Sequence, residues 1–445
     1  MITPKFVRTQ HFKVPFQGAF FLGTVFPWRC HGLKEKCPLR GVRSLNIQKT
    51  HIRDLRPLKL PAVCLGSSVS AMASPSLGRR SFLQSALLLP ALRQFDFALQ
   101  AAPANIDREP LACKHLAEAV ERGLLHSASL HVQRGGSAFS RAFGTARSEH
   151  AMFLLGSISK PVAVAALMRL YDGGAFRLDD PLVKYLPRFS GEGREEVTLK
   201  QVLTHVSGLP DQVLRNAELR RSHAPLSQFV EEAQRTPLGF APGSRYEYSS
   251  MGILLAARVA EVITGLDICT LVQRSVFDPL GMKHSAQGLG RFSVGELEPV
   301  QTEFAAPEAG GGDPGAKDWD WNSGYWRALG SPWGGTHCSA PDVGRFLAEF
   351  LRGDGILFKP ETARMIVSNH NPQGAPPRGL GFDLGMAAGL PGCSERTFGH
   401  TGSTGTIGWA DPATQTVCVV LTSLPARAVS PHPRDLSAAR VAAGR

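Results

Sequence analysis

The 445-residue chain lacks the patterns that would indicate a zinc protein or a disulfide-stabilised protein. Its eight cysteines form no Cys-x-x-Cys pair and no zinc-ligand spacing, so no metal or cofactor is expected. Long apolar runs are also missing, and the run Ala86–Leu92 is too short for a stable membrane span. The cysteines beyond residue 104 are odd in number and widely spaced, which predicts small core residues or free thiols: Cys113, Cys269, Cys338, Cys393 and Cys418.

The net charge of +12 is confined to the N-terminal part of the chain. Residues 1–71 carry twelve Lys or Arg and two Asp or Glu, and residues 72–102 add three arginines and one aspartate. Residues 103–445 are therefore neutral overall. The high isoelectric point thus gives no reason to expect nucleic acid or a membrane surface as a partner.

A twin-arginine pair follows Met72, the first methionine after Met1. Arg79-Arg80 precedes a short apolar stretch that ends at Leu92, and Ala102-Pro-Ala104 offers small residues for cleavage, although Arg93 and Asp96 intervene. The segment 72–104 resembles a twin-arginine export signal, which predicts a periplasmic or secreted protein. Residues 1–71 are then a leader of doubtful status. They are either a mis-started reading frame or a basic organelle-targeting presequence, which would direct the protein to an organelle instead.

The pattern of apolar residues changes along the rest of the chain. Residues 106–125 are typical of an amphipathic helix, and the alternating runs 128–133 and 138–143 around Gly135-Gly136 predict a hairpin. Helical patterns follow at 162–173, 198–204, 226–235, 249–264 and 341–351, and short strand patterns at 380–384, 397–400, 406–409 and 416–422. Strands near both ends with helices between them favour an α+β fold, in which both ends of the chain build one antiparallel sheet.

A Ser-x-x-Lys motif, Ser157 to Lys160, follows a glycine and the apolar run Met152–Leu155. Because the residues after it are typical of a helix, hydroxyl and amine three positions apart share a face and can meet. A buried lysine can lose its proton and then accept one from serine. For the motif alone, a solvated lysine near a helix start is the alternative. No Gly-x-Ser-x-Gly elbow occurs, which excludes that route to a reactive serine.

Further motifs stand in a fixed order after the serine. They are Leu178–Pro187, Leu203–Pro210, Pro242–Ser249 and Pro279–Met282. With Ser-x-x-Lys, this set resembles the serine β-lactamase and penicillin-binding protein-like superfamily, in its class C-like branch of esterases, D-peptidases and β-lactamases. The resemblance covers about residues 110–424. It implies an antiparallel sheet flanked by N- and C-terminal helices, with a mainly helical inserted domain.

The resemblance also implies domain boundaries. Residues 105–165 and 325–445 would form the sheet domain, and residues 166–324 the helical domain with the active-site loop. Tyr248-Ser249-Ser250 resembles the family's Tyr-x-Asn motif. An ammonium beside a phenol favours phenolate, so Tyr248 would share base duty with Lys160 and later protonate the leaving group. A half-buried loop aromatic is the alternative interpretation of Tyr248.

His400-Thr401-Gly402 resembles the family's Lys-Thr-Gly strand, with histidine in place of lysine. Gly402 would let a substrate lie close to the strand backbone. The resemblance implies an oxyanion hole from the backbone N–H groups of Ser157 and Ser403. A structural strand histidine is the alternative for His400.

Two departures from the family motifs bear on the substrate. Ser250 is too short to replace the asparagine that helps to bind an amide, and His400 is mostly neutral near pH 7. Both weaken the case for efficient β-lactam hydrolysis and favour a neutral ester, or a peptide bound in another manner. Four tryptophans crowd a Gly/Pro/Asp-rich stretch, Trp319, Trp321, Trp326 and Trp333, where they would either line an acyl pocket or pin the loop to the core.

The sequence therefore predicts a serine hydrolase that forms an acyl-enzyme on Ser157, with Lys160 and Tyr248 as catalytic residues. Ser250, His400, Thr401, Gly402 and Ser403 complete the predicted site. The expected substrate is a small ester, lactam or D-peptide, with an ester first. The alternative is a non-catalytic binding or scaffold module. A proline-rich C-terminus, where the resemblance implies a packing helix, supports that alternative. The sequence leaves the oligomeric state open.

Overall fold

The computed structural model describes residues 109–444. The predicted leader (1–71) and export signal (72–104) lie outside the described residues and stay predictions. Within the described part of the chain, no helix combines the length and apolar character that crossing a bilayer requires.

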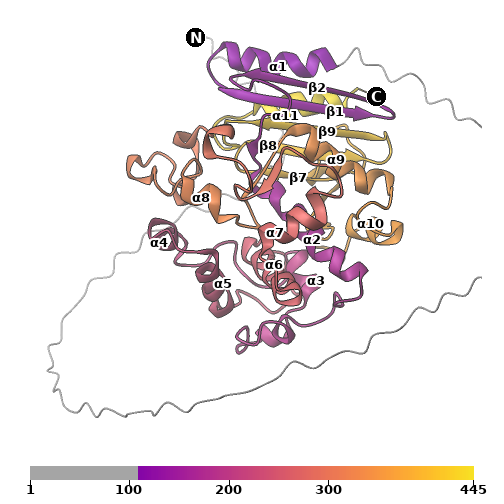
Figure 1. Ribbon diagram of the computed structural model, residues 1–445. Coiled ribbons are helices and arrows are strands. Elements are labelled where there is room, and N and C mark those ends of the chain that lie inside the picture. The colour runs from indigo at the N-terminus through magenta and orange to yellow at the C-terminus, as the bar shows by residue number, and fades with distance from the viewer. Residues whose placement is uncertain (1–108, 445) are drawn as a thin grey trace, which may run out of the picture. The chain divides into compact units, whose positions relative to one another are not determined.

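A six-stranded antiparallel sheet in the order β2-β1-β9-β8-β7-β6 forms the centre of the fold (Figure 1). Its first two strands form the predicted hairpin, paired from Ser127 opposite Gly144 to Arg134 opposite Ser137. Strand β9 lies directly beside β1, so the two ends of the described chain meet in the sheet. The strands are β1 Ser127–Arg134, β2 Ser137–Gly144, β6 Asp383–Leu384, β7 Phe398–Gly402, β8 Thr406–Asp411 and β9 Thr416–Thr422.

Side chains alternate between the two faces of this sheet, as strand geometry requires. In β9, Cys418 and Val420 face the helices α1 (Glu109–Glu121) and α11 (Pro433–Ala442). Val417, Val419 and Leu421 belong to the larger core on the other face, where α9 (Ala340–Arg352) packs. The sheet is therefore covered on both faces, and the predicted α+β class with flanking terminal helices is confirmed.

Helix α11 corrects one prediction, because the proline-rich C-terminus does continue into a packing helix. Pro433 occupies the first turn, where its missing N–H costs nothing. The side chain of His432 caps the helix by accepting a hydrogen bond from the backbone of Arg434. Ser437 Oγ donates to the Ala112 carbonyl at 3.0 Å, which ties α11 to α1. The proline-rich end therefore no longer supports the non-catalytic alternative.

The residues between the strands are mainly helical, and α2 (Ser159–Asp172) packs against α6 (Ser250–Thr264) in their midst. The predicted helix at 226–235 matches α5 (Leu226–Arg235), whereas the predicted strand 380–384 is reduced to β6. The remaining helices are α3 Leu199–Leu203, α4 Asn216–Arg221, α7 Ile268–Val272, α8 Gly324–Leu329 and α10 Pro360–Ile366.

A second, three-stranded sheet contains the strand that directly precedes the segment of Ser157. Its order is β3-β5-β4, and its members are β3 Phe153–Leu154, β4 Ser285–Gln287 and β5 Thr336–Cys338. Leu155 N donates to the Thr336 carbonyl at 2.9 Å. From the other side, Thr404 and Thr406 donate to the carbonyls of Leu154 and Leu155 at 2.7 and 2.6 Å. The segment before Ser157 is therefore held between the two sheets.

Candidate active site

Ser157 and Lys160 meet at the start of α2. Ser157 lies in the short 3-10 turn Gly156–Ile158, and Lys160 is the second residue of the helix. Lys160 Nζ lies 3.0 Å from Ser157 Oγ and also donates to the Trp333 carbonyl at 3.0 Å. The lysine side chain is only 1% exposed. The structure thus brings the two groups of the Ser-x-x-Lys motif into hydrogen-bond contact.

The surroundings of Lys160 favour its neutral form. Burial lowers the pKa of the amine, Asp211 acts in the opposite direction and the nearby Arg378 lowers it again, which together bring the pKa to about 7. Near pH 7 a large fraction of the amine is therefore unprotonated. In that form Nζ can accept the proton of the Ser157 hydroxyl, which is the requirement for a general base.

Tyr248 reaches Ser157 from the start of α6. Ser249 caps this helix by accepting a hydrogen bond from Gly252 N at 3.0 Å, and it donates to the Pro210 carbonyl at 2.8 Å. This fixes the backbone on which Tyr248 stands. The side chains of Tyr248 and Ser157 are hydrogen-bonded. Lys160 Nζ lies 4.7 Å from the centre of the tyrosine ring.

The predicted phenolate form of Tyr248 is not supported. Burial raises the pKa of the phenol well above its ordinary value, and this outweighs the hydrogen bond to Ser157 and the attraction of Arg378, both of which lower it. The lysine is therefore the group that loses its proton near neutral pH. Tyr248 stays a neutral phenol, which can pass a proton on but does not serve as a second base.

His205 packs against the ring of Tyr248 and holds the backbone that follows it. Its ring lies 4.6 Å from the tyrosine ring, and its Nδ1 accepts a hydrogen bond from Ser249 N at 3.1 Å. The backbone φ of His205 is +62°, a value that non-glycine residues rarely adopt and that functional sites often contain. Burial holds the pKa of His205 well below its usual value, so the ring is neutral.

The predicted oxyanion donors lie on neighbouring backbone segments. Ser157 and Ser403 both line a cavity of about 220 Å³. Gly156 has a φ of +58°, and a Cβ placed on it would come within 3.2 Å of Ser403 N. The glycine therefore allows the backbone before Ser157 to approach the end of β7 closely. The two N–H groups can serve one developing oxyanion only in such an arrangement.

His400 lies beneath the site and does not line the cavity. Its side chain is 3% exposed, and its ring lies 6.1 Å from the ring of Tyr248. Nδ1 donates to the Thr401 carbonyl at 2.7 Å, and Asp383 Oδ2 lies 3.7 Å from it. Burial and the Arg378 cation hold the pKa of His400 well below its usual value. The ring is therefore neutral, as predicted, but it faces Tyr248 instead of a substrate.

Thr401 and Gly402 are also absent from the cavity lining within the described residues. A Cβ on Gly402 would lie 2.1 Å from the Leu155 carbonyl oxygen and 2.2 Å from Thr406 Oγ1. The glycine thus lets the chain's own backbone lie against β7, which is a structural reason for a glycine at position 402. The predicted approach of a substrate to this strand stays a prediction.

Ser250 lines the cavity, but its hydroxyl is already engaged. Ser250 Oγ and N both donate to Asp211 Oδ1, at 2.6 and 2.9 Å. Asp211 lines the same cavity and was missed from the sequence, although it directly follows the motif Leu203–Pro210. A carboxylate that accepts two hydrogen bonds from one residue fixes that residue in place. Ser250 is therefore a rigid part of the wall.

Three of the four tryptophans meet both predictions for this stretch, because Trp321, Trp326 and Trp333 line the cavity beside Ser157 and also belong to the large hydrophobic core. Trp319 is buried against Gly310 of the same stretch. The three side chains at the cavity form an apolar wall. Such a wall suits the carbon chain of an acyl group.

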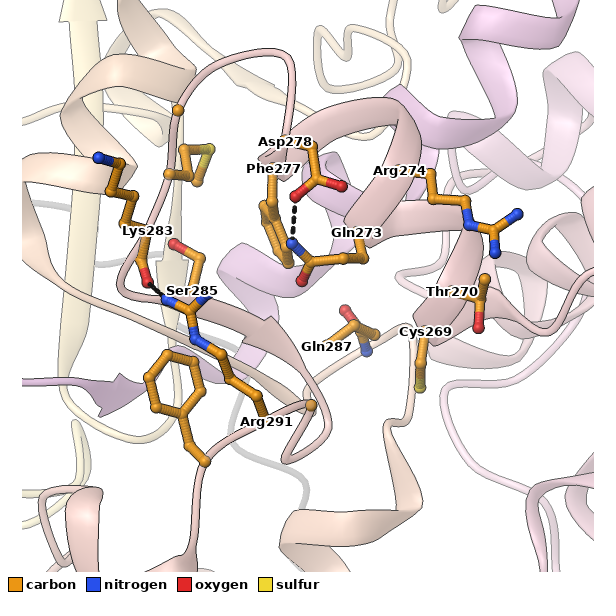
Figure 2. A pocket seen from close by; sticks show the side chains of 14 residues that line it. Cys269, Thr270, Gln273, Arg274, Phe277, Asp278, Lys283, Ser285, Gln287 and Arg291 are labelled. Carbon is orange, nitrogen blue, oxygen red and sulfur yellow. Dashed lines mark hydrogen bonds between the residues drawn. The ribbon is translucent and has the colours of Figure 1, made fainter.

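A second, larger cavity of about 610 Å³ lies at α7 and β4, and no residue that lines it also lines the Ser157 cavity (Figure 2). Gln273 donates to Asp278 at 2.6 Å, and Arg291 donates to the Lys283 carbonyl at 2.5 Å. Ser285 Oγ donates to Asp342 at 3.0 Å and has no lysine or tyrosine partner among the described residues. The smaller cavity therefore holds the reactive serine.

The β-lactamase family model matches residues 114–443, and the chain belongs to this family. Esterase EstB of Burkholderia gladioli is 30% identical over 315 residues, which make up 61% of this chain and 76% of the esterase. A candidate D-alanyl-D-alanine carboxypeptidase of Escherichia coli (strain K12) is 26% identical over 287 residues, or 58% of this chain and 66% of that protein.

Solved structures agree on the fold. EstCE1, a hydrolase with promiscuous acyltransferase activity, superposes with a TM-score of 0.61 at 22% identity and covers 76% of this chain and 99% of its own. A penicillin-binding protein homologue from Caulobacter crescentus gives a TM-score of 0.61 at 21% identity, covering 76% and 98%. The resemblance stated from the motifs is thus confirmed, and the protein is a serine hydrolase of the β-lactamase family.

Proposed function

We propose that the protein hydrolyses carboxylic esters through an acyl-enzyme on Ser157. The observation that carries this proposal is the contact between Ser157 Oγ and a buried amine whose pKa is lowered to about 7. A neutral amine at 3.0 Å is positioned to take the hydroxyl proton as the oxygen attacks. The name of the relative EstB, an esterase, supports the same substrate class.

The proposed reaction has two halves. Ser157 Oγ attacks the ester carbonyl while its proton moves to Lys160 Nζ, and the N–H groups of Ser157 and Ser403 stabilise the oxyanion. The C–O bond to the alcohol breaks. Tyr248 donates its phenol proton to the leaving oxygen and takes up in return the proton that Lys160 had accepted. Water then attacks the acyl-enzyme, gives up a proton along the same route, and releases the acid and the free serine.

Two features favour an ester over an amide or a β-lactam. Ser250, which stands where the family's amide-binding asparagine is expected, donates its hydroxyl to Asp211 and is not available to a substrate amide. His400, which stands where a lysine would attract a β-lactam carboxylate, is buried and neutral. A simple ester has neither an amide group nor a β-lactam carboxylate to bind, and its alkoxide leaves more easily than the anion of an amine, so an ester depends less on both contacts.

Active-site labelling tests the nucleophile. A fluorophosphonate probe is expected to label the wild-type protein and to leave Ser157→Ala unlabelled. Ser159→Ala is the matched control, because Ser159 is a buried serine on the same turn whose Oγ accepts from Thr336 N and touches no substrate. Absence of labelling in a folded wild-type protein would favour the non-catalytic binding or scaffold module.

The substrate class is tested with a panel of p-nitrophenyl esters, D-alanyl peptides and a chromogenic cephalosporin. The highest kcat/KM is expected for an ester. A higher value for the peptide or the cephalosporin would replace the esterase assignment while leaving the serine nucleophile intact.

We also propose export by the twin-arginine route. The support is Arg79-Arg80, the apolar stretch that follows it and the small residues Ala102–Ala104, all outside the described residues. N-terminal sequencing of the native product is the check, and a peptide from residues 1–71 in the mature protein would contradict it.

A further inference from the structure

One wall of the Ser157 cavity carries a buried cation without a partner. Arg220, near the end of α4, lines the cavity and is only 4% exposed. Its guanidinium carbon lies 3.8 Å from the ring centre of Trp326. Nε and Nη1 are buried and make no hydrogen bond within residues 109–444. Buried guanidinium donors without acceptors are costly, and native proteins rarely keep them without a use.

Arg220 forms no ion pair within the described residues. No acidic oxygen of residues 109–444 lies within ion-pair distance of it, and Glu308 attracts the guanidinium from farther away. Asp211 on the same cavity is held by Ser250, and Glu308 is exposed, so water screens it. Burial lowers the pKa of Arg220 to about 10, which still leaves it fully charged at neutral pH.

Arg220 is held firmly where it stands. Trp326, on α8, forms the face on which the guanidinium stacks. The neighbouring Tyr325 donates its hydroxyl to the Ala224 carbonyl at 2.9 Å, and its ring stacks on His223 at 4.8 Å. These contacts join the end of α4 to α8. The planar guanidinium is therefore pre-positioned at the cavity wall, where it can bind an anionic acceptor such as a carboxylate.

Arg220 is the one cation among the described residues that line the Ser157 cavity. The Lys160 amine is largely neutral, and Arg378 lies behind Tyr248, where it forms an ion pair with Asp383. Any anionic group that enters the cavity thus has a single strong partner. The cavity volume of about 220 Å³ is smaller than usual ligand pockets, so it suits one part of a substrate, such as a short acyl chain.

We propose that Arg220 binds a carboxylate on the acyl part of the substrate, so that the preferred substrates are monoesters of short dicarboxylic acids. Ser157 attacks the ester end of such an acyl group, the three tryptophans cover its carbon chain, and the guanidinium holds its free acid end. This inference rests on the proposed esterase function and adds a substrate class to it.

A matched pair of esters tests the inference. The p-nitrophenyl monoester of glutaric acid carries the free carboxylate, and its methyl diester, p-nitrophenyl methyl glutarate, has the same chain without the charge. The wild-type protein is expected to prefer the anionic ester by tenfold or more in kcat/KM, mainly through a lower KM. Added salt is expected to reduce this preference.

Substitution of the cation should remove the preference. In Arg220→Gln the kcat/KM ratio of anionic to neutral ester is expected to fall to near one, and Arg220→Lys should keep part of it. The ratio of the two kcat/KM values is informative even if the substitution disturbs the packing against Trp326, because that disturbance affects the hydrolysis of both esters. Arg215→Gln is the matched control, since Arg215 lies on the exposed side, pairs with Glu218 and Glu232, and should leave the ratio unchanged.

A binding measurement without turnover completes the test. Glutarate should bind to the Ser157→Ala protein, measured by calorimetry, at least tenfold more tightly than to Ser157→Ala with Arg220→Gln. A wild-type preference for the neutral ester would overturn the inference but leave the proposed esterase function intact. Equal glutarate affinity with and without the Arg220 guanidinium would have the same meaning. Hydrolysis of neither ester, together with no probe labelling at Ser157, would instead overturn the proposed function.

Discussion

At the scale of single residues, burial divides the proton chemistry between two side chains. The same burial that lowers the pKa of the Lys160 ammonium raises the pKa of the Tyr248 phenol, because in both cases it disfavours the charged form. The amine becomes a base near pH 7 and the phenol remains a proton donor. A Ser-x-x-Lys pair thus needs no histidine in direct contact with the serine.

The first prediction concerns the pH dependence of hydrolysis. We expect kcat/KM for a p-nitrophenyl ester to rise about tenfold per pH unit below pH 7 and to level off above it, because the Lys160 amine accepts a proton only once it has lost its own. Lys160→Arg should be inactive throughout, since a guanidinium stays protonated. Lys200→Arg, at an exposed ion pair with Asp179, is the control. A rate that is flat from pH 5 to 9 would contradict the assignment.

The sequence was informative for residues whose spacing is itself the signal. Ser157, Lys160 and Tyr248 stand in motifs, and the structure brings them together. Arg220 was missed because it belongs to a charged run in α4 that has the pattern of a solvated helix face. Burial results from tertiary packing, which a local sequence pattern does not show. For the same reason, the sequence did not show that the side chain of His400 is buried.

At the scale of secondary structure elements, one strand end determines the shape of the oxyanion region. Strand β7 ends at Gly402, where the backbone of Leu155 lies so close that a Cβ would overlap its carbonyl oxygen. Beyond it, the turn to β8 supplies the two threonines that hold Leu154 and Leu155. The position of Ser157 therefore depends on the hairpin β7–β8 as much as on its own helix.

The second prediction follows from this close approach. Gly402→Ala is expected to destabilise the fold by about 1–3 kcal/mol or more, because the new methyl group meets backbone that has no room to move. Gly324→Ala, at the start of α8 with open space around it, should change stability by less than about 1 kcal/mol. The free energy of unfolding of both variants is measured with urea. Equal values would contradict the prediction, because they would show that the backbone of β7 shifts to make room for the methyl group.

Elements with a sustained period were predictable, and very short ones were not. Strand β9 and helix α5 have the predicted bounds, since a seven-residue apolar run rich in β-branched residues and a helical period over ten residues are strong signals. The sheet β3-β5-β4 has strands of two or three residues, too few for a period to show. The local pattern alone did not indicate helix α11, because the prolines before it and Pro433 in its first turn are typical of a loop.

At the scale of the whole molecule, the order of the motifs carried more information than the composition. Their sequence along the chain identified the family and with it the α+β fold, which the family match over residues 114–443 confirms. The predicted division into a sheet domain and a helical domain stays a prediction. The positive net charge belongs to the N-terminal part of the chain and does not describe the surface around the cavity.

The pairing of β1 with β9 has a consequence for biosynthesis. Ser129 lies opposite Leu421 in the middle of the sheet, so the ribosome synthesises the second strand of this pair long after the first. Contacts between residues so distant in sequence form slowly, because a long loop must close first. The nascent chain therefore holds Ser157 and Lys160 long before β7 and β8 emerge to complete their surroundings, and hydrolase activity can begin only after these two strands have been synthesised.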